Sequence, residues 1–206
     1  MKQVNKIRKS EQVMTQKGKN QITKICQKAA QVFSSKGYNS ASLVDVSRAA
    51  GLSKGGIYHY FSTKEELLFT ILDNFMDILL DGLEKELETI SSPEEKIRYF
   101  IRRHIRQYCD NVYSSRIVLH ETNNLPASYW SAIRKKSKQY TFILGDILKE
   151  YFISDKAASE RVRVITYILL GMCNLIYWWY DPKGPVKPDD LAEEIFTVFI
   201  GKIKAL

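Results

Sequence analysis

Residues 53–60, with the sequence SKGGIYHY, bring hydroxyl, ammonium, imidazole and phenol groups together within about two helical turns. Tyr58 and His59 could form hydrogen bonds with base edges or phosphate oxygens. Ser53 and Lys54 lie at the start of the segment, where the free N–H groups of a helix attract a phosphate. The chemistry that these groups predict is recognition of a nucleic acid. The alternative for Tyr58 is packing in the protein core, and for His59 it is a solvated surface position.

The sequence around this segment predicts the two helices that must position it. Ser42 can cap a helix over residues 43–50, and Asp45 three residues later approximates a capping box. Gly51 supplies a tight turn, and a second helix follows over residues 54–60. Two short helices joined in this way are typical of a helix-turn-helix, which places one helix end in the DNA major groove. The predicted DNA contacts are Ser42, Ser53, Lys54, Gly55, Tyr58, His59, Tyr60 and Lys64.

The distribution of charge supports the same interpretation independently. Residues 1–64 hold 12 Lys and Arg against 2 Asp and Glu, whereas residues 65–206 hold 19 against 21. The net charge of +8 therefore arises from the segment that carries the motif. Basic residues that neutralise phosphates release condensed counterions, which contributes much of the affinity for DNA. A basic, solvated N-terminal tail is the alternative explanation.

The length of the chain, 206 residues, leaves room for a second packed unit of about 140 residues beyond the motif. With 45% hydrophobic and 12% aromatic residues, such a unit can form a core. We predict a flexible basic arm over residues 1–18, a DNA-binding domain over 19–63, and a ligand-binding and dimerisation domain over 64–206.

The apolar pattern predicts an all-α fold, because no stretch shows sustained alternation with period two. Proline and glycine in DPKGPVKP separate the last two predicted helices. The predicted helices, about nine, cover residues 19–36, 43–50, 54–60, 64–89, 93–112, 114–122, 126–152, 156–180 and 188–204.

The three cysteines indicate neither a disulfide framework nor a zinc site, because they are far apart and show no CxxC spacing. No hydrophobic signal segment opens the sequence, so we expect a cytoplasmic protein. Residues 164–180 carry no charge, but this run is short for a membrane span and contains Gly171 and Asn174. A buried helix of a soluble bundle fits it better, so we expect no membrane partner. From the cysteine spacing we also expect no metal.

A group of residues in the first third of the chain resembles the TetR family of bacterial regulators. The resemblance covers about 50 residues, and Ala41 departs from it where many members carry a hydroxyl residue. It implies three N-terminal helices holding a helix-turn-helix, a linking fourth helix and a larger C-terminal helical domain. The matching residues are Phe33, Gly37, Tyr38, Ser42, Val44, Asp45, Val46, Ala50, Gly51, Leu52, Ser53, Lys54, Gly55, Tyr58, Tyr60, Phe61, Lys64, Glu65 and Leu67.

The resemblance also implies a homodimer that reads a palindromic double-stranded operator, usually as a repressor. In this family the last two helices pair with their copies as a four-helix bundle. The expected interface residues are Tyr177, Trp178, Phe196 and Phe199. Alternatively, these aromatic residues pack only within the monomer.

A weaker likeness suggests which effector the C-terminal domain binds. Near the C-terminus, a group of residues resembles the corresponding segment of the TetR subgroup that responds to acyl-coenzyme A thioesters. These residues are Asn174, Tyr177, Trp178, Trp179, Tyr180, Pro182 and Gly184. An acyl-CoA or another small apolar effector is therefore expected, with no cofactor. The candidate ligand residues are Phe75, Phe100, His104, Tyr108 and Tyr140. His104 could instead be satisfied by a protein group, and Arg102, Arg103 and Arg106 could bind a coenzyme A phosphate or lie on a solvated face.

Two other functions compete with a ligand-responsive regulator. A helical enzyme acting on acyl thioesters would need a nucleophile and base, and no specific spacing of this kind occurs. A non-specific architectural protein would bind all duplexes alike. For a regulator, Tyr58→Ala should reduce operator discrimination, and Lys64→Ala should weaken binding to all duplexes and lower the salt slope by about 1.

Overall fold

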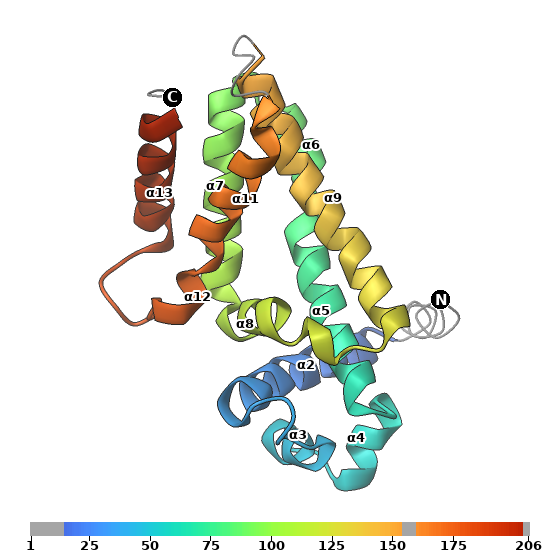
Figure 1. Cartoon of the computed structure of the whole chain (residues 1–206). Coiled ribbons are helices and arrows are strands. Elements are labelled where there is room, and N and C mark those ends of the chain that lie inside the picture. Colours follow the sequence, from blue (N-terminus) through green and yellow to red (C-terminus); the bar gives the residue numbers. More distant parts are fainter. Residues whose placement is uncertain (1–14, 154–159, 204–206) are drawn as a thin grey trace. The chain divides into compact units, whose positions relative to one another are not determined.

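The computed structural model describes residues 15–153 and 160–203, and helices are its only regular elements there. This confirms the predicted all-α fold (Figure 1). The chain divides into two compact units, of which the first comprises residues 1–76 and 113–135 and the second residues 77–112 and 136–206. The predicted boundary after residue 63 is sequential, whereas α5 and α9 each contribute residues to both units.

Unit 1 is built on three helices and the first turns of a fourth. These are α2 (Gln16–Lys36), α3 (Leu43–Ala50), α4 (Lys54–Tyr60) and the part of α5 (Lys64–Leu80) up to Met76. Most of α8 (Val112–His120), the 3-10 turn η1 (Thr122–Asn124) and the start of α9 (Ala127–Tyr151) complete it. Its core holds fully buried apolar side chains from every helix of the motif, including Ile25, Phe33, Val46, Ile57 and Leu67.

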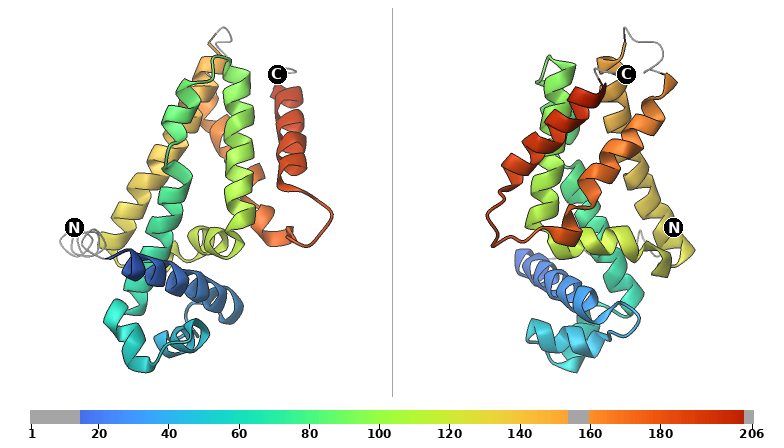
Figure 2. Two further views of the ribbon diagram at one scale, coloured as in Figure 1. Left: turned by 180° about the vertical axis from the view of Figure 1, so that it is seen from behind. Right: turned by 60° about the vertical axis from the view of Figure 1, so that its left-hand side comes forward.

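Unit 2 is a helical bundle in which α7 (Pro93–Asp110) is the central element. The last helix, α13 (Pro188–Ile203), lies along α7, and α11 (Val162–Asn174) and α12 (Ile176–Trp179) also contact α7 (Figure 2). The end of α5, the short α6 (Leu83–Glu88) and the later part of α9 complete the unit. Helix α7 begins as its sequence predicts, with Ser92 as N-cap and Pro93 in the first turn.

The helix predicted over residues 64–89 is wrong in one respect, because it breaks in the middle. Helix α5 ends at Leu80, Gly82 adopts a left-handed conformation with φ of 71°, and α6 starts at Leu83. Arg103 on α7 stabilises the break, since its Nη2 donates to the carbonyl oxygens of Ile78 and Asp81. These carbonyl groups lie at the end of α5, where no intrahelical donor reaches them.

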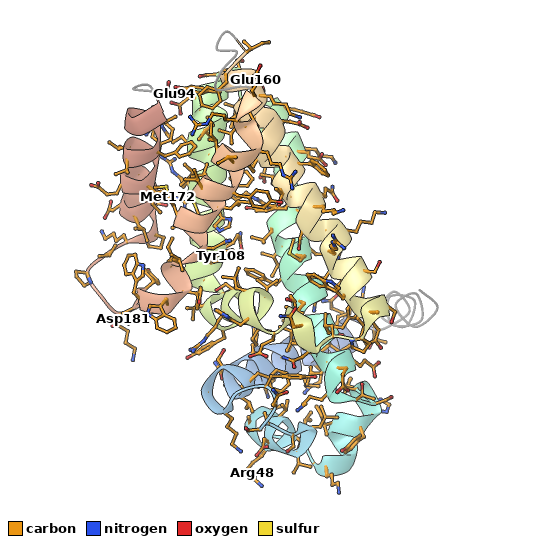
Figure 3. The ribbon with its side chains drawn as sticks, in the orientation of Figure 1. Arg48, Glu94, Tyr108, Glu160, Met172 and Asp181 are labelled. Carbon is orange, nitrogen blue, oxygen red and sulfur yellow. The ribbon has the colours of Figure 1, made fainter. Side chains whose placement is uncertain are left out.

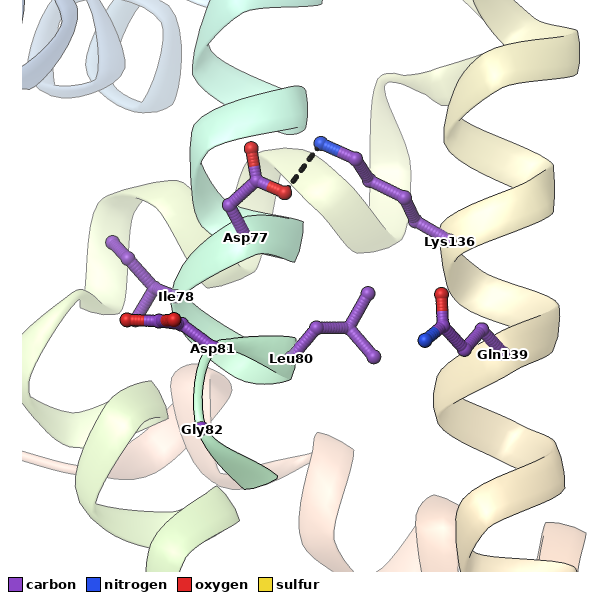
Figure 4. Close-up of a pocket in the computed structure, with 7 residues that line it drawn as sticks. All are labelled: Asp77, Ile78, Leu80, Asp81, Gly82, Lys136 and Gln139. Carbon is purple, nitrogen blue, oxygen red and sulfur yellow. Dashed lines mark ion pairs between the residues drawn. The ribbon is translucent and has the colours of Figure 1, made fainter. Parts of the chain in front are cut away.

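The same break borders a shallow groove within unit 2 (Figure 4). Lys136 of α9 reaches across it and forms an ion pair of 2.6 Å with Asp77 at the end of α5. The pair joins α5 to α9 beside the break, so the groove contains a closed polar contact rather than a free charge.

Several other helix boundaries differ from the prediction by one or two residues, and two segments differ by more. Helix α2 begins at Gln16, with Thr15 as its N-cap, so its first residues belong to the segment predicted as an arm. Residues 1–14 of that arm lie outside the described residues. The helix predicted over 156–180 is divided at Leu175 into α11 and α12, and residues 154–159 are also outside the description.

Candidate nucleic-acid interface

Helix α4 presents a polar face because its apolar face is anchored in unit 1. Ile57 has no exposed surface, and Phe61, which caps the C-terminal end of α4, is also buried. The N-terminus is fixed by Ser53, whose Oγ accepts a hydrogen bond of 3.0 Å from the N–H of Gly56. Lys54 is exposed and the Tyr58 side chain is 47% exposed. These side chains are accessible, as those of a recognition helix must be.

The other predicted residues of α4 differ in how accessible they are. His59 and Gly55 are exposed, and a Cβ atom at Gly55 would meet no other atom within 4 Å. Tyr60 is half-buried, with its ring edge-to-face against His59 at 5.0 Å. The space around Gly55 is therefore open, and this position adds no side chain to the N-terminal end of α4.

Helix α3 is held by a complete capping box. The Ser42 hydroxyl accepts from the Asp45 N–H at 3.2 Å, and the Asp45 carboxylate accepts from the Ser42 N–H at 3.0 Å. Lys36 forms an ion pair of 2.6 Å with the same carboxylate. Hydrogen bonds from Lys36 and Ser42 lower the pKa of Asp45 well below its usual value. The Ser42 hydroxyl also donates to Asp45, so the cap already occupies it.

The turn between the two helices requires a glycine. Gly51 has φ of 70° and ψ of 34°, the left-handed region that other residues adopt at a cost. Its N–H bonds to the carbonyl of Arg48, which closes α3. The side chain of Arg48 is exposed and extends away from the helices of unit 1 (Figure 3). Arg48 was missed as a candidate phosphate contact, although its charge beside the turn could have indicated it.

Lys64, predicted to contact DNA, instead has its ammonium group among main-chain carbonyls of unit 1. Its Nζ donates to the carbonyl oxygens of Tyr38 at 2.9 Å, Ala41 at 3.0 Å and Asn39 at 3.4 Å. The same Nζ lies 4.4 Å from the centroid of the Tyr38 ring. These contacts use all three N–H groups of an ammonium. The geometry therefore favours a structural role, in which Lys64 ties the first turn of α5 to the loop that precedes α3.

In unit 2, four of the five candidate ligand residues meet in one cluster. His104 Nδ1 lies 3.0 Å from the Tyr140 hydroxyl, and the His104 ring stacks on Tyr108 at 4.1 Å. Phe100 contacts Tyr140 with ring centroids 4.9 Å apart. The fifth candidate, Phe75, is buried in unit 1.

Burial keeps this cluster uncharged. Desolvation lowers the pKa of His104 to about 3 and raises the pKa values of Tyr108 and Tyr140 above their usual range. The neighbouring Cys173 thiol is fully buried, which raises its pKa to about 12. At neutral pH the cluster therefore offers hydrogen bonds but no charge.

The arginine residues of α7 are occupied by acidic residues within unit 2. Arg106 forms a bidentate pair with Asp189 at 2.6 and 2.7 Å. Arg103 binds Glu86 at 2.9 Å, and Arg102 approaches Glu193 at 4.0 Å. Carboxylates of unit 2 therefore compensate these guanidinium groups at least in part.

The predicted interface aromatics fall into two groups. Phe196 and Phe199 are buried within unit 2, where the Arg98 guanidinium lies 3.8 Å from the Phe196 ring. Tyr177 is half-buried, whereas Trp178 is 73% exposed. Phe196 and Phe199 therefore have core positions in the monomer, and their side chains are not surface groups.

Helices α11 and α12 carry an exposed apolar stripe that the sequence analysis did not identify. Val164, Tyr167 and Ile168 recur on α11 at intervals of three and four residues, the spacing of one helix face, and exposed apolar residues follow at the break and on α12. This spacing could have revealed it. The window from Val162 to Trp179 is also apolar and long enough to cross a membrane by composition alone, and 39% of it is buried. The apolar stripe consists of Val164, Tyr167, Ile168, Leu175 and Trp178.

Two family models match this chain. The model described as "Bacterial regulatory proteins, tetR family" covers residues 25–71, and "Tetracyclin repressor-like, C-terminal domain" covers residues 91–203. Together they include the polar face of α4 and most of unit 2.

Among curated relatives, the transcriptional activator FasR of Mycolicibacterium smegmatis is 33% identical over 166 residues, which are 80% of this chain and 74% of FasR. The transcriptional repressor KstR2 of the same species is 23% identical over 188 residues, 87% of this chain and 88% of KstR2. Both are regulators of transcription, not enzymes.

Solved structures show the same fold. A TetR-family regulator from Bordetella parapertussis superposes with a TM-score of 0.83 at 28% identity, covering 90% of this chain and 96% of that chain. AibR in complex with isovaleryl coenzyme A and operator DNA gives a TM-score of 0.73 at 24% identity, covering 86% of this chain and 97% of that chain. With the helix-turn-helix geometry, these matches show that the chain belongs to the TetR family of bacterial DNA-binding transcription regulators.

Proposed function

We propose that this chain is a ligand-responsive repressor that binds a palindromic operator as a homodimer and is released by a small apolar or acyl-CoA effector. The observation that carries the proposal is the exposure of Lys54, Tyr58 and His59 on α4, a helix that the buried Ile57 anchors in unit 1. A short helix anchored in this way can approach base edges and phosphates at once. Repression is the mode given for KstR2, whereas FasR is an activator.

The apolar stripe on α11 and α12 supports the homodimer. Exposed apolar patches of this kind mark interaction surfaces in soluble proteins. A second copy of the same stripe is a fitting partner, because a two-fold interface brings one patch against itself. We therefore assign the interface to the stripe, with Trp178 retained from the sequence prediction and Phe196 and Phe199 assigned to the core.

The cluster around His104 supports an effector site in unit 2. Phe100, Tyr108 and Tyr140 give it an apolar wall, and His104 adds a neutral polar group. AibR, which shares the fold, was crystallised with isovaleryl coenzyme A and operator DNA. An effector that prefers a conformation with displaced recognition helices would weaken operator binding by its differential affinity, typically about 1–3 kcal/mol. Helix α5, which contributes to both units, is the proposed carrier of this change.

The test is fluorescence anisotropy of the protein on labelled DNA from its own promoter region, titrated with straight-chain acyl-CoA thioesters. Release by a thioester, but not by free coenzyme A, is expected. Tight operator binding that ignores every thioester would remove the acyl-CoA effector and retain the regulator. Equal affinity for scrambled DNA would instead indicate an architectural protein, and turnover of a thioester would indicate an enzyme.

Tyr58→Ala should lower discrimination between operator and scrambled DNA by about 5- to 150-fold, the cost of one lost base contact of about 1–3 kcal/mol. Stability should change little, because the side chain is exposed. Competition binding with both duplexes measures the ratio. Tyr113→Ala is a matched control, since Tyr113 is equally exposed in unit 1 but lies on α8. An unchanged ratio for Tyr58→Ala would show that Tyr58 does not contribute to recognition of the operator sequence.

A further inference from the structure

The cluster around His104 in unit 2, which Asn174 also approaches, contains a buried nitrogen without a hydrogen bond of normal geometry. Within the described residues, His104 Nε2 makes no hydrogen bond of normal geometry, and the side chain is fully buried. A weak side-chain interaction with Asn174 opposes the fall in the His104 pKa that burial causes. A buried polar group without a partner is costly, so such groups call for an explanation.

The hydrogen bond to Tyr140 determines which ring nitrogen of His104 carries the proton. If the Tyr140 hydroxyl donates to Nδ1, the phenol proton is satisfied and Nε2 carries the ring N–H. In the other tautomer, Nδ1 donates to the phenol oxygen, which leaves both the phenol proton and the Nε2 lone pair unsatisfied. The first tautomer leaves one buried group without a partner instead of two, so it is favoured. His104 therefore presents an unused N–H donor.

The chemistry of that donor limits what it can bind. A neutral imidazole N–H needs a hydrogen-bond acceptor, and the apolar rings of Phe100, Tyr108 and Tyr140 surround it. A carboxylate would bring a charge among these apolar rings, where its desolvation is costly. A carbonyl oxygen of a thioester, ester or ketone meets the requirement without a charge.

A ligand would have to enter where α11 ends. Asn174 is the last residue of α11 and is half-buried, and the following Leu175 is exposed at the break before α12. Displacement of the Asn174 side chain would open this route to Nε2.

We propose that His104 Nε2–H donates a hydrogen bond to a neutral carbonyl oxygen of the effector, and that this contact selects thioesters over the corresponding free acids. The proposal rests on the proposed function, since it names the group in unit 2 that recognises the effector. Tyr140 is the positioning residue, because its hydroxyl holds Nδ1 and so keeps the proton on Nε2.

The experiment compares two probes that differ only at the carbonyl. Acyl-CoA thioesters from four to sixteen carbons are titrated by calorimetry, and the tightest is paired with its S-alkyl-CoA thioether, which has a methylene group in place of the carbonyl. The wild-type protein should bind the thioether at least about tenfold more weakly, as loss of one buried hydrogen bond implies. His104→Phe should reduce this ratio to about one, and Tyr140→Phe should lower it partially.

Each outcome has a distinct meaning. Equal affinity of the wild-type protein for thioester and thioether would overturn the carbonyl contact, for example if a buried water satisfies Nε2, while leaving the acyl-CoA effector in place. Binding of no thioester would overturn both the contact and the effector class, while operator binding, measured in parallel, would still test the regulator. Tyr99→Phe is the matched control in unit 2, because the Tyr99 hydroxyl bonds to Glu86 outside the cluster and its ratio should stay at the wild-type value. If His104→Phe fails to fold, a ratio in Tyr140→Phe equal to that of the wild type contradicts the proposal.

Discussion

Replacing Lys64 by methionine is expected to destabilise unit 1 by about 2–3 kcal/mol and to leave the salt dependence of operator binding unchanged. The ammonium donates to the carbonyl oxygens of Tyr38 and Ala41, and methionine can make neither bond. Both carbonyl groups would then lack their donor in a partly buried loop. The ammonium is fully occupied by protein groups, so its loss should release no additional counterions from DNA.

Two measurements separate this role from the phosphate contact that the sequence predicts. Thermal unfolding should show a midpoint lower by several degrees, and operator affinity against salt concentration should keep the wild-type slope. Lys54→Met is the matched control: Lys54 is exposed at the start of α4, so its loss should lower the slope by about 1 per protomer without changing stability. A Lys64→Met protein of normal stability with a reduced slope would restore Lys64 as a phosphate contact.

Replacing Ile168 by glutamate should convert the protein to a monomer and weaken operator binding by at least about 100-fold. Ile168 lies in the middle of the apolar stripe and is 53% exposed, so the new charge is tolerated in the monomer. In a dimer the same position would bury two carboxylates against apolar side chains, which is strongly unfavourable. Linked binding to two half-sites contributes a factor of about 10²–10⁴, and this factor is lost with the dimer.

Sedimentation analysis and operator titration of the same samples check this result. Ile153→Glu provides the control, because Ile153 is an isoleucine with 82% exposure just past the end of α9 and lies outside the stripe. The Ile153→Glu protein should remain dimeric and bind the operator with wild-type affinity. A dimeric Ile168→Glu protein would exclude the stripe as the interface and require another surface.

The helix-turn-helix could be predicted closely because its signals are local. Ser42 and Ser53 cap α3 and α4, and Gly51 ends α3, so both helices occupy their predicted residues. The break in the predicted helix 64–89 was missed because the apolar pattern continues through Gly82. The break depends on the left-handed conformation of Gly82 and on Arg103, which reaches it from a later helix. A distant partner of this kind is not visible in a local pattern.

The candidate sites show the same contrast between features with local sequence signals and features that depend on distant residues. The exposed groups of α4 could be predicted because the segment is short and polar, with Ile57 as its one buried residue. The carbonyl partners of Lys64 lie 23 to 26 residues earlier, and the sequence gives no sign that the loop turns its oxygens toward α5. His104 and Tyr108 of α7 were predicted as ligand residues from the sequence, but the partner of His104 comes from α9, 36 residues later. Tertiary packing therefore determined these roles.

The reactivity of the buried thiols can report how often each unit opens locally. Cys26 lies in unit 1, whereas Cys109 and Cys173 lie in unit 2, and all three are buried thiols outside any disulfide. Because burial raises the pKa of Cys109 to about 11 and of Cys173 to about 12, neither thiol reacts appreciably until its surroundings open. The rate at which each cysteine is alkylated thus reports the opening frequency of its own unit. A molecule that slows alkylation of Cys173 but not of Cys26 would reveal which unit it occupies, without any label attached to protein or DNA.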